Sequence, residues 1–200
     1  MYSKISLEKY LEMIAVPNAT PGGGSVSGYA GALGAALGSM ASGIALKKVM
    51  PNSHDCGTLK KAQKIFSKNH SSLLKLAEAD SAAYDKVSQA YKLPHHILKR
   101  RNEINRALRT ATEVPYRTML LSLENLNEIS NVRKLLPVQI LSDINVAILL
   151  SKAAYNGARL NVIVNVESLT DKKVSRKIEK DIDKVEQAFA ETVLWLDDWM

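Results

Sequence analysis

The sequence predicts an all-α protein, a bundle of long and partly kinked helices around a central helix rich in glycine and alanine. Along most of the chain, apolar residues recur at every third or fourth position, which is the period of an amphipathic helix. The one Asn-Gly pair, Asn156-Gly157, does not separate two alternating runs, so hairpin signals are nearly absent. Because 200 residues suit a single hydrophobic core, we expect residues 1–200 to form one domain.

The first two helices are expected on either side of a sharp connection. Ser6 can cap a short helix that ends before Pro17, and Ser25 can cap a second helix after the connection 18–24. Glycine destabilises a helix by nearly 1 kcal/mol relative to alanine, so the glycines of this second helix indicate close packing with other backbones. They belong to a stripe without bulky side chains: Gly28, Gly31, Ala35, Gly38, Ser42 and Ala45.

A long third helix is expected over residues 58–91, followed by a fourth that Pro94 can open and Pro115 should kink or break. The apolar face of the third helix consists of Leu59, Ala62, Phe66, Leu73 and Leu76.

Two further helices complete the predicted bundle. The fifth begins at Pro137, or is capped by Ser142 or Asp143, and continues to Val166. A sixth starts near Thr170 and carries an apolar stripe that suits packing against a neighbour: Val174, Ile178, Ile182, Val185, Phe189, Val193 and Leu196. Long helices with wide apolar faces on a small chain often pair across a twofold axis, so we expect a homodimer.

Composition excludes several classes of protein. With Cys56 as the single cysteine and four histidines, an internal disulfide is impossible and no metal site is expected. Residues 1–10 lack the apolar core of a secretory signal, which favours the cytoplasm. The net charge of +7 comes from basic residues dispersed over helix faces, and only 6% of residues are aromatic, so no nucleic-acid partner is expected. An anionic small molecule remains compatible with this charge.

Residues 26–46 are uncharged for long enough to cross a bilayer. Fourteen of these residues are Gly, Ala or Ser, however, and spanning helices depend instead on larger apolar side chains. The prediction is therefore a buried core helix and no membrane partner.

The glycine-rich connection is the first candidate site. Gly22, Gly23, Gly24 and Ser25 leave backbone N–H groups free at the positive end of a helix, where a carboxylate or carbonyl oxygen can bind. The spacing matches neither a phosphate loop nor a dinucleotide motif. A tight turn with a helix cap is the alternative interpretation.

Four other polar residues are candidates for chemistry. Asp80 lies among alanines in a long helix, and a buried carboxyl there would have a raised pKa and could transfer protons. As a solvated surface residue it would be unremarkable, and Asp143 has the alternative role of a helix cap. Asn161 and Asn165 are four apart in an apolar run, so their amides need hydrogen-bond partners in the protein or in a ligand.

Five motifs in this order resemble the formiminotetrahydrofolate cyclodeaminase family across about residues 5–170. The motifs are Pro21-Gly22-Gly23-Gly24-Ser25; Asp80-Ser81-Ala82-Ala83-Tyr84, closely followed by Ala90-Tyr91-Lys92-Leu93-Pro94; Ala111-Thr112-Glu113-Val114-Pro115; Ser142-Asp143-Ile144-Asn145-Val146-Ala147; and Gly157-Ala158-Arg159-Leu160-Asn161-Val162-Ile163-Val164-Asn165. The resemblance implies an all-helical, dimeric enzyme without a cofactor that acts on tetrahydrofolate one-carbon adducts.

In the cyclodeaminase reaction, N10 of 5-formiminotetrahydrofolate attacks the formimino carbon, 5,10-methenyltetrahydrofolate forms and ammonia leaves. By the resemblance, Asp80 and Asp143 would be acid and base in one cleft, in an unassigned order. The other implied contacts to folate are Asn161 and Asn165 on the pterin edge, Gly22, Gly23, Gly24 and Ser25 on a carbonyl or carboxylate, and Thr112 and Glu113 on the cleft wall. The basic excess would favour a polyglutamylated substrate.

Three alternatives remain open. Family members that act as methenyltetrahydrofolate cyclohydrolases bring water to the same carbon. A noncatalytic helical scaffold or regulator would keep the fold without the chemistry. A nucleic-acid-binding bundle is favoured only by the basic isoelectric point.

Overall fold

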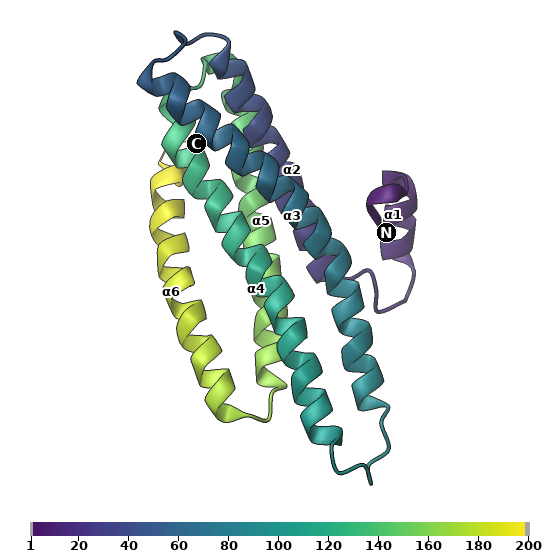
Figure 1. Cartoon of the computed structure of the whole chain (residues 1–200). Coiled ribbons are helices and arrows are strands. Elements are labelled where there is room, and N and C mark those ends of the chain that lie inside the picture. Colours follow the sequence, from purple (N-terminus) through teal and green to yellow (C-terminus); the bar gives the residue numbers. More distant parts are fainter. Residues whose placement is uncertain (1, 199–200) are drawn as a thin grey trace.

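The computed structural model describes residues 2–198, and within that range it is all-α, as predicted, with no strand (Figure 1). A short helix, α1 (Leu7–Ala15), lies beside a bundle of long helices. The long helices are α2 (Gly23–Leu46), α3 (His54–Tyr91), α4 (Arg100–Val132), α5 (Leu141–Glu167) and α6 (Lys172–Asp197). Single 3-10 turns cover Tyr2–Lys4, Arg133–Leu135 and Val138–Ile140.

Several helix ends differ from the prediction. Ser6 caps α1 as expected, since its hydroxyl accepts a hydrogen bond from the Lys9 N–H. The N-cap of α2 is Gly22, however, and Ser25 lies inside the first turn with its side chain buried. Pro94 falls in the loop before α4, because that helix begins only at Arg100. At α6 the cap is Asp171, whose carboxylate accepts from the N–H groups of two following residues.

Pro115 does not break α4, which continues through it from Arg100 to Val132. Proline removes the hydrogen bond that its own N–H would make to the carbonyl four residues earlier. That carbonyl belongs to Ala111, and it accepts a hydrogen bond from the Asn165 side chain of α5 instead. A partner for the freed carbonyl helps the helix to tolerate the proline.

Helix α2 is central, and its small residues are what bring the other helices close. It packs against α3, α4 and α5. A Cβ at Gly28 would lie 2.9 Å from the Ala77 Cβ of α3, and one at Gly38 would lie 2.7 Å from the Phe66 ring. Gly31 faces side chains of all three neighbours. The predicted stripe is therefore the contact surface of the central helix.

The main apolar core lies where α2, α3, α4 and α5 meet, with Phe66, Leu126, Ile129 and Ile148 fully buried. Within residues 2–198, α2 is the one helix whose length and composition would also allow it to cross a membrane. Its glycine and alanine stripe is buried against helices of the same chain. This packing supports the interpretation of α2 as a core helix.

Helix α1 is attached mainly through one side chain. Tyr10 is buried, its ring lies 4.5 Å from that of Tyr29, and its hydroxyl is 2.9 Å from the Ser25 hydroxyl. Leu7 and Leu11 of the same helix are exposed. Of these three apolar side chains of α1, only Tyr10 is thus buried within the chain.

The packing of α2 on α3 makes a prediction about stability. Gly28→Ala should lower the free energy of unfolding by about 1–3 kcal/mol, because the new methyl group would push against the backbone of α3. Gly57→Ala is the matched control: Gly57 lies in α3, a methyl group there would have nothing within 4 Å, and this change should be neutral or stabilise by up to about 1 kcal/mol. Denaturant unfolding followed by circular dichroism measures both, and equal effects of the two substitutions would contradict the account.

Candidate active site

The candidate site residues gather in a cavity of about 290 Å³ at one end of the bundle. It lies where α2 begins, near the ends of α3 and α5, beside the first half of α4. Six of the predicted residues line it: Gly22, Gly23, Gly24, Asp80, Asn161 and Asn165. Larger surface depressions lie between α3 and α4 and between α4 and the start of α6, but they contain none of these six. We therefore take this cavity as the candidate active site.

Asp80 and Gly24 form the closest approach in this cavity. Asp80 projects from α3 toward the first turn of α2, and a Cβ at Gly24 would overlap its carboxyl group. Any side chain at position 24 would therefore displace the carboxyl from this place. A carboxylate at the N-terminus of a helix is stabilised by the positive end of the helix dipole and by free N–H groups. The triple glycine thus receives a carboxylate of the protein itself.

Two opposing effects act on the pKa of Asp80. Burial raises it above the ordinary aspartate value, because the charged form loses solvation, and a hydrogen bond from the Ser25 backbone N–H opposes that rise. The net shift is upward. Asp80 is consequently a partly buried carboxyl whose proton affinity is higher than that of a surface aspartate, as proton transfer requires.

Ser25 contacts Asp80 through its backbone and Tyr10 through its side chain. Its side chain is fully buried and shares a hydrogen bond of 2.9 Å with the Tyr10 hydroxyl. Its backbone N–H donates a hydrogen bond to the Asp80 carboxyl group. The expected contact between Ser25 and a ligand is not seen in the cavity lining. Through Tyr10, the residue instead connects the carboxyl site to α1.

Asn161 and Asn165, both on α5, also line the cavity. The Asn161 Nδ2 donates to the Gly157 carbonyl at 2.8 Å, and the Asn165 Nδ2 donates to the Ala111 carbonyl at 2.9 Å. A carbonyl can only accept, so both amide nitrogens must face the protein and both Oδ1 atoms must point elsewhere. The amide oxygens are thereby available as acceptors in a cavity that Asp80 also lines.

Besides Ser25, three predicted residues do not reach this cavity. Asp143 lies in the first turn of α5, 18 positions before Asn161 and thus about 27 Å away along the helix axis. Within one chain it cannot share a cleft with Asp80. Thr112 and Glu113 follow Ala111 but line a separate depression against α6. Thr112 is buried there, with its hydroxyl bonded to the Leu108 carbonyl.

Sequence reasoning missed the apolar wall of the cavity. The wall consists of Tyr84, Val87, Tyr91, Leu108 and Ala111. Tyr84, Tyr91 and Ala111 appeared in the sequence analysis only as members of motifs, without a role. On α3 the lining positions are 80, 84, 87 and 91, at successive steps of four, three and four. That spacing is one face of a helix, so the sequence contained a signal for these positions.

Within residues 2–198, no group of three or more His, Cys, Asp or Glu side chains could hold a metal ion.

Comparison with known proteins identifies the family. Residues 6–184 match the family model described as formiminotransferase-cyclodeaminase. Over 184 residues the chain is 30% identical to methenyltetrahydrofolate cyclohydrolase of Methylorubrum extorquens, covering 89% of this chain and 87% of that protein. It is also 27% identical to formimidoyltransferase-cyclodeaminase of Gallus gallus over 90% of its own length, but spans only 34% of that longer protein.

The fold agrees with a solved structure. The crystal structure of formiminotetrahydrofolate cyclodeaminase from Thermotoga maritima superposes with a TM-score of 0.87 at 22% identity, covering 96% of this chain and 93% of that one. At this identity the likeness concerns the fold, while the family assignment rests on the sequence matches. The chain therefore belongs to the formiminotransferase-cyclodeaminase family of folate one-carbon enzymes.

Proposed function

We propose that this chain cyclises 5-formiminotetrahydrofolate to 5,10-methenyltetrahydrofolate with release of ammonia, and that Asp80 transfers the proton. The observation that carries the proposal is the position of Asp80, a partly buried carboxyl in a cavity that also contains two amide oxygens. The polar groups of this cavity suit a ligand that presents N–H groups and positive charge.

Charge complementarity supports this substrate class. The protonated formimino group and the methenyl bridge are both amidinium cations, with the charge shared between two nitrogens and the carbon between them. An ionised Asp80 beside that carbon would stabilise the charge in a site partly shielded from water. The Asn161 and Asn165 oxygens would accept hydrogen bonds from the amino and ring N–H groups of the pterin.

One carboxyl group is sufficient for the reaction. N10 forms a bond to the protonated formimino carbon, and its proton moves to Asp80. Asp80 passes that proton to the amino nitrogen, the bond from carbon to this nitrogen breaks, and ammonia leaves. The positive charge remains on the methenyl bridge, so the step needs no second acid. Asp143, which lies outside this cavity within the chain, has no part in this scheme.

A cyclohydrolase is the second candidate, and the similarity to the Methylorubrum extorquens cyclohydrolase over nearly the whole of both chains favours it. In that reaction water adds to the methenyl carbon and Asp80 accepts one of its protons. Asp80 then passes this proton to N5, the bond from carbon to N5 breaks, and the remaining hydroxyl proton is released to solvent as the 10-formyl product forms. The same carboxyl group would serve both reactions.

Parallel assays distinguish these functions. With 5-formiminotetrahydrofolate, a cyclodeaminase increases methenyltetrahydrofolate absorbance and releases ammonia in equal amount, which is the expected result. With 5,10-methenyltetrahydrofolate, a cyclohydrolase makes that absorbance fall without ammonia. Turnover of neither compound by folded protein would contradict the proposal and favour a noncatalytic scaffold.

Asp80→Asn should reduce turnover by roughly 10²–10⁴-fold without loss of stability at neutral pH. Burial raises the pKa of Asp80 in the folded state, so ionisation of Asp80 lowers the free energy of unfolding. This destabilisation is absent at pH values below the unfolded-state pKa. It develops as the pH rises through the folded-state pKa. An uncharged amide removes that effect. In the unchanged protein, turnover should decrease as pH falls through a pKa above the ordinary aspartate value, because Asp80 must be ionised to accept the proton.

Rate–pH profiles and thermal unfolding of both proteins test this prediction. An active Asp80→Asn variant with the same acid limb as the unchanged protein would show that another group transfers the proton.

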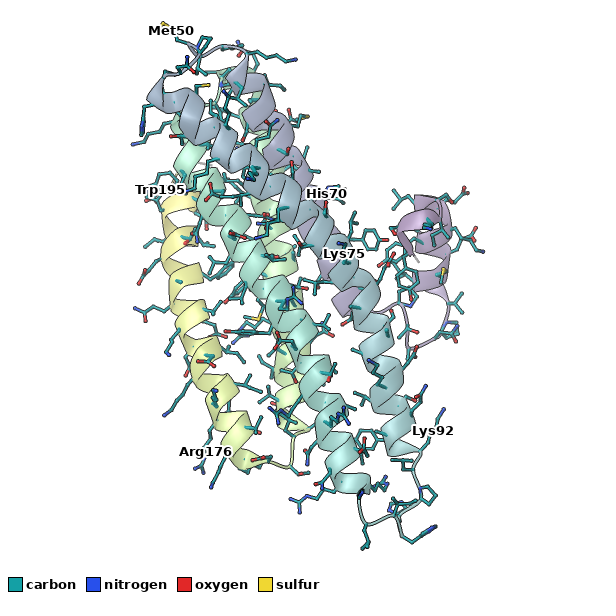
Figure 2. All side chains as sticks on the ribbon, viewed as in Figure 1. Met50, His70, Lys75, Lys92, Arg176 and Trp195 are labelled. Carbon is teal, nitrogen blue, oxygen red and sulfur yellow. The ribbon has the colours of Figure 1, made fainter. Side chains whose placement is uncertain are left out.

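A polyglutamylated substrate is part of the proposal. The cavity lining includes Tyr91, next to Lys92, and Lys92 and Arg176 lie toward the end of the bundle opposite Met50 (Figure 2). Within residues 2–198, many basic side chains near this end form no ion pair: Lys86, Lys92, Lys99, Arg106, Arg109, Lys172, Lys173, Arg176 and Lys177. Their positive field would attract successive glutamate carboxylates of such a tail.

The cytoplasmic location of the protein also stays a prediction. It is the compartment where we expect polyglutamylated folates.

We also propose a homodimer, formed through the outer faces of α2 and α5. The two helices pack side by side and expose large apolar side chains: Val26, Leu33 and Met40 on α2, and Val146, Leu149, Leu160 and Val164 on α5. A second copy presenting the same apolar surface would cover it. Sedimentation velocity should give a dimer at micromolar concentration, and Leu33→Lys with Leu160→Lys should shift it to monomer. A monomeric mass of the unchanged protein throughout would contradict the proposal.

A further inference from the structure

Pro115 lies in the middle of α4, at a position where most residues would donate a backbone hydrogen bond to the Ala111 carbonyl. Proline has no N–H, and its ring also pushes against the carbonyl four residues earlier. The Ala111 carbonyl thus lacks the hydrogen-bond partner that the helix would otherwise supply. It becomes an acceptor for a group outside α4.

The group that takes this place is the side chain of Asn165. Its Nδ2 donates to the Ala111 oxygen at 2.9 Å, joining α5 to α4 across 54 positions of sequence. Because the carbonyl can only accept, the amide cannot turn over without losing this bond. The hydrogen bond therefore sets the direction of the Asn165 Oδ1.

A second buried amide shows what a purely structural role looks like. Asn125 donates to the Gly31 carbonyl at 3.2 Å and accepts from Asn69 at 3.1 Å, so both ends of its amide are bonded within the protein. Asn165 donates in the same way, yet within residues 2–198 nothing donates to its Oδ1. Both Asn165 and Ala111 line the cavity that contains Asp80. The unbonded end of the amide belongs to the ligand cavity.

We propose that Pro115 is a positioning residue for ligand binding, which acts by leaving the Ala111 carbonyl free to hold Asn165. Asn165 then presents its Oδ1 as an acceptor for an N–H group of the ligand. This inference rests on the proposed function for the identity of that ligand, the pterin of a folate. Pro115 itself contributes no side-chain hydrogen bond to the cavity, so its effect on binding passes through Asn165.

A double-mutant cycle tests the proposal, with 5-formyltetrahydrofolate as a stable probe in calorimetric titrations. Asn165→Ala should weaken binding by roughly five- to tenfold, the effect of one lost hydrogen bond. In Pro115→Ala the restored N–H competes for the Ala111 carbonyl, so binding should weaken several-fold although the protein stays folded. The double variant should bind no more weakly than Asn165→Ala alone. Losses that multiply, or unchanged binding by Pro115→Ala, would overturn the proposal.

Two control variants keep the test specific. Asn156 also lies on α5 and donates to a backbone carbonyl, at 3.0 Å from the Lys152 oxygen, but it lies outside the cavity. Asn156→Ala should bind the probe as the unchanged protein does. Pro137→Ala removes a proline at the start of a 3-10 turn outside the cavity and should also leave binding unchanged.

A measurement on the free protein separates this inference from the proposed function. In NMR spectra of the free protein, the Asn165 side-chain NH₂ signals can be assigned by their loss in Asn165→Ala. In Pro115→Ala these signals should move toward the chemical shifts of solvent-exposed amides. Unchanged signals would overturn the positioning role whether or not folate binds. If the NH₂ signals move but the unchanged protein binds no folate, the positioning of Asn165 stands and the proposed function fails.

Discussion

The site depends on one steric condition, the absence of a side chain at Gly24. Because no Cβ is present there, the Asp80 carboxyl of α3 can lie against the first turn of α2. That position combines burial, which raises the pKa of Asp80, with a backbone N–H at the helix start, which limits the rise. The proposed role of Asp80, to accept a proton and release it again, would benefit from such an intermediate environment.

The absence of side chains at the glycines of α2 determines both the helix packing and the position of the site. Gly28, Gly31 and Gly38 let α3, α4 and α5 approach the central helix, and Gly24 extends that close approach to the carboxyl of Asp80. The remaining polar groups then come from neighbours of α2, with Asn165 fixed by a carbonyl that Pro115 leaves free. Packing requirements thus determine where the candidate catalytic groups meet. The chain belongs to a family of folate one-carbon enzymes, and the proposed chemistry of these groups follows from that membership.

Helical periodicity predicted the fold, the buried face of α3 and the small-residue stripe, because each depends on spacing within one helix. The cavity was predicted in part. Asp80, Asn161, Asn165 and the triple glycine do meet, whereas Asp143 lies in the first turn of α5, outside this cavity. Periodicity specifies which face of a helix is buried. It does not specify the position along their axes at which two helices come into contact. It also cannot show that Thr112, one position after Ala111, faces α6 instead of the cavity.

The most direct test of this account is the turnover of Gly24→Ala compared with Gly57→Ala. Both replace a helical glycine, but only the methyl group at position 24 would overlap Asp80. Displacing the carboxyl by about 1 Å should reduce turnover roughly 100-fold, while Gly57→Ala should leave it unchanged. A folded Gly24→Ala protein with the activity of the unchanged enzyme would contradict the central claim that catalysis requires Asp80 at the start of α2.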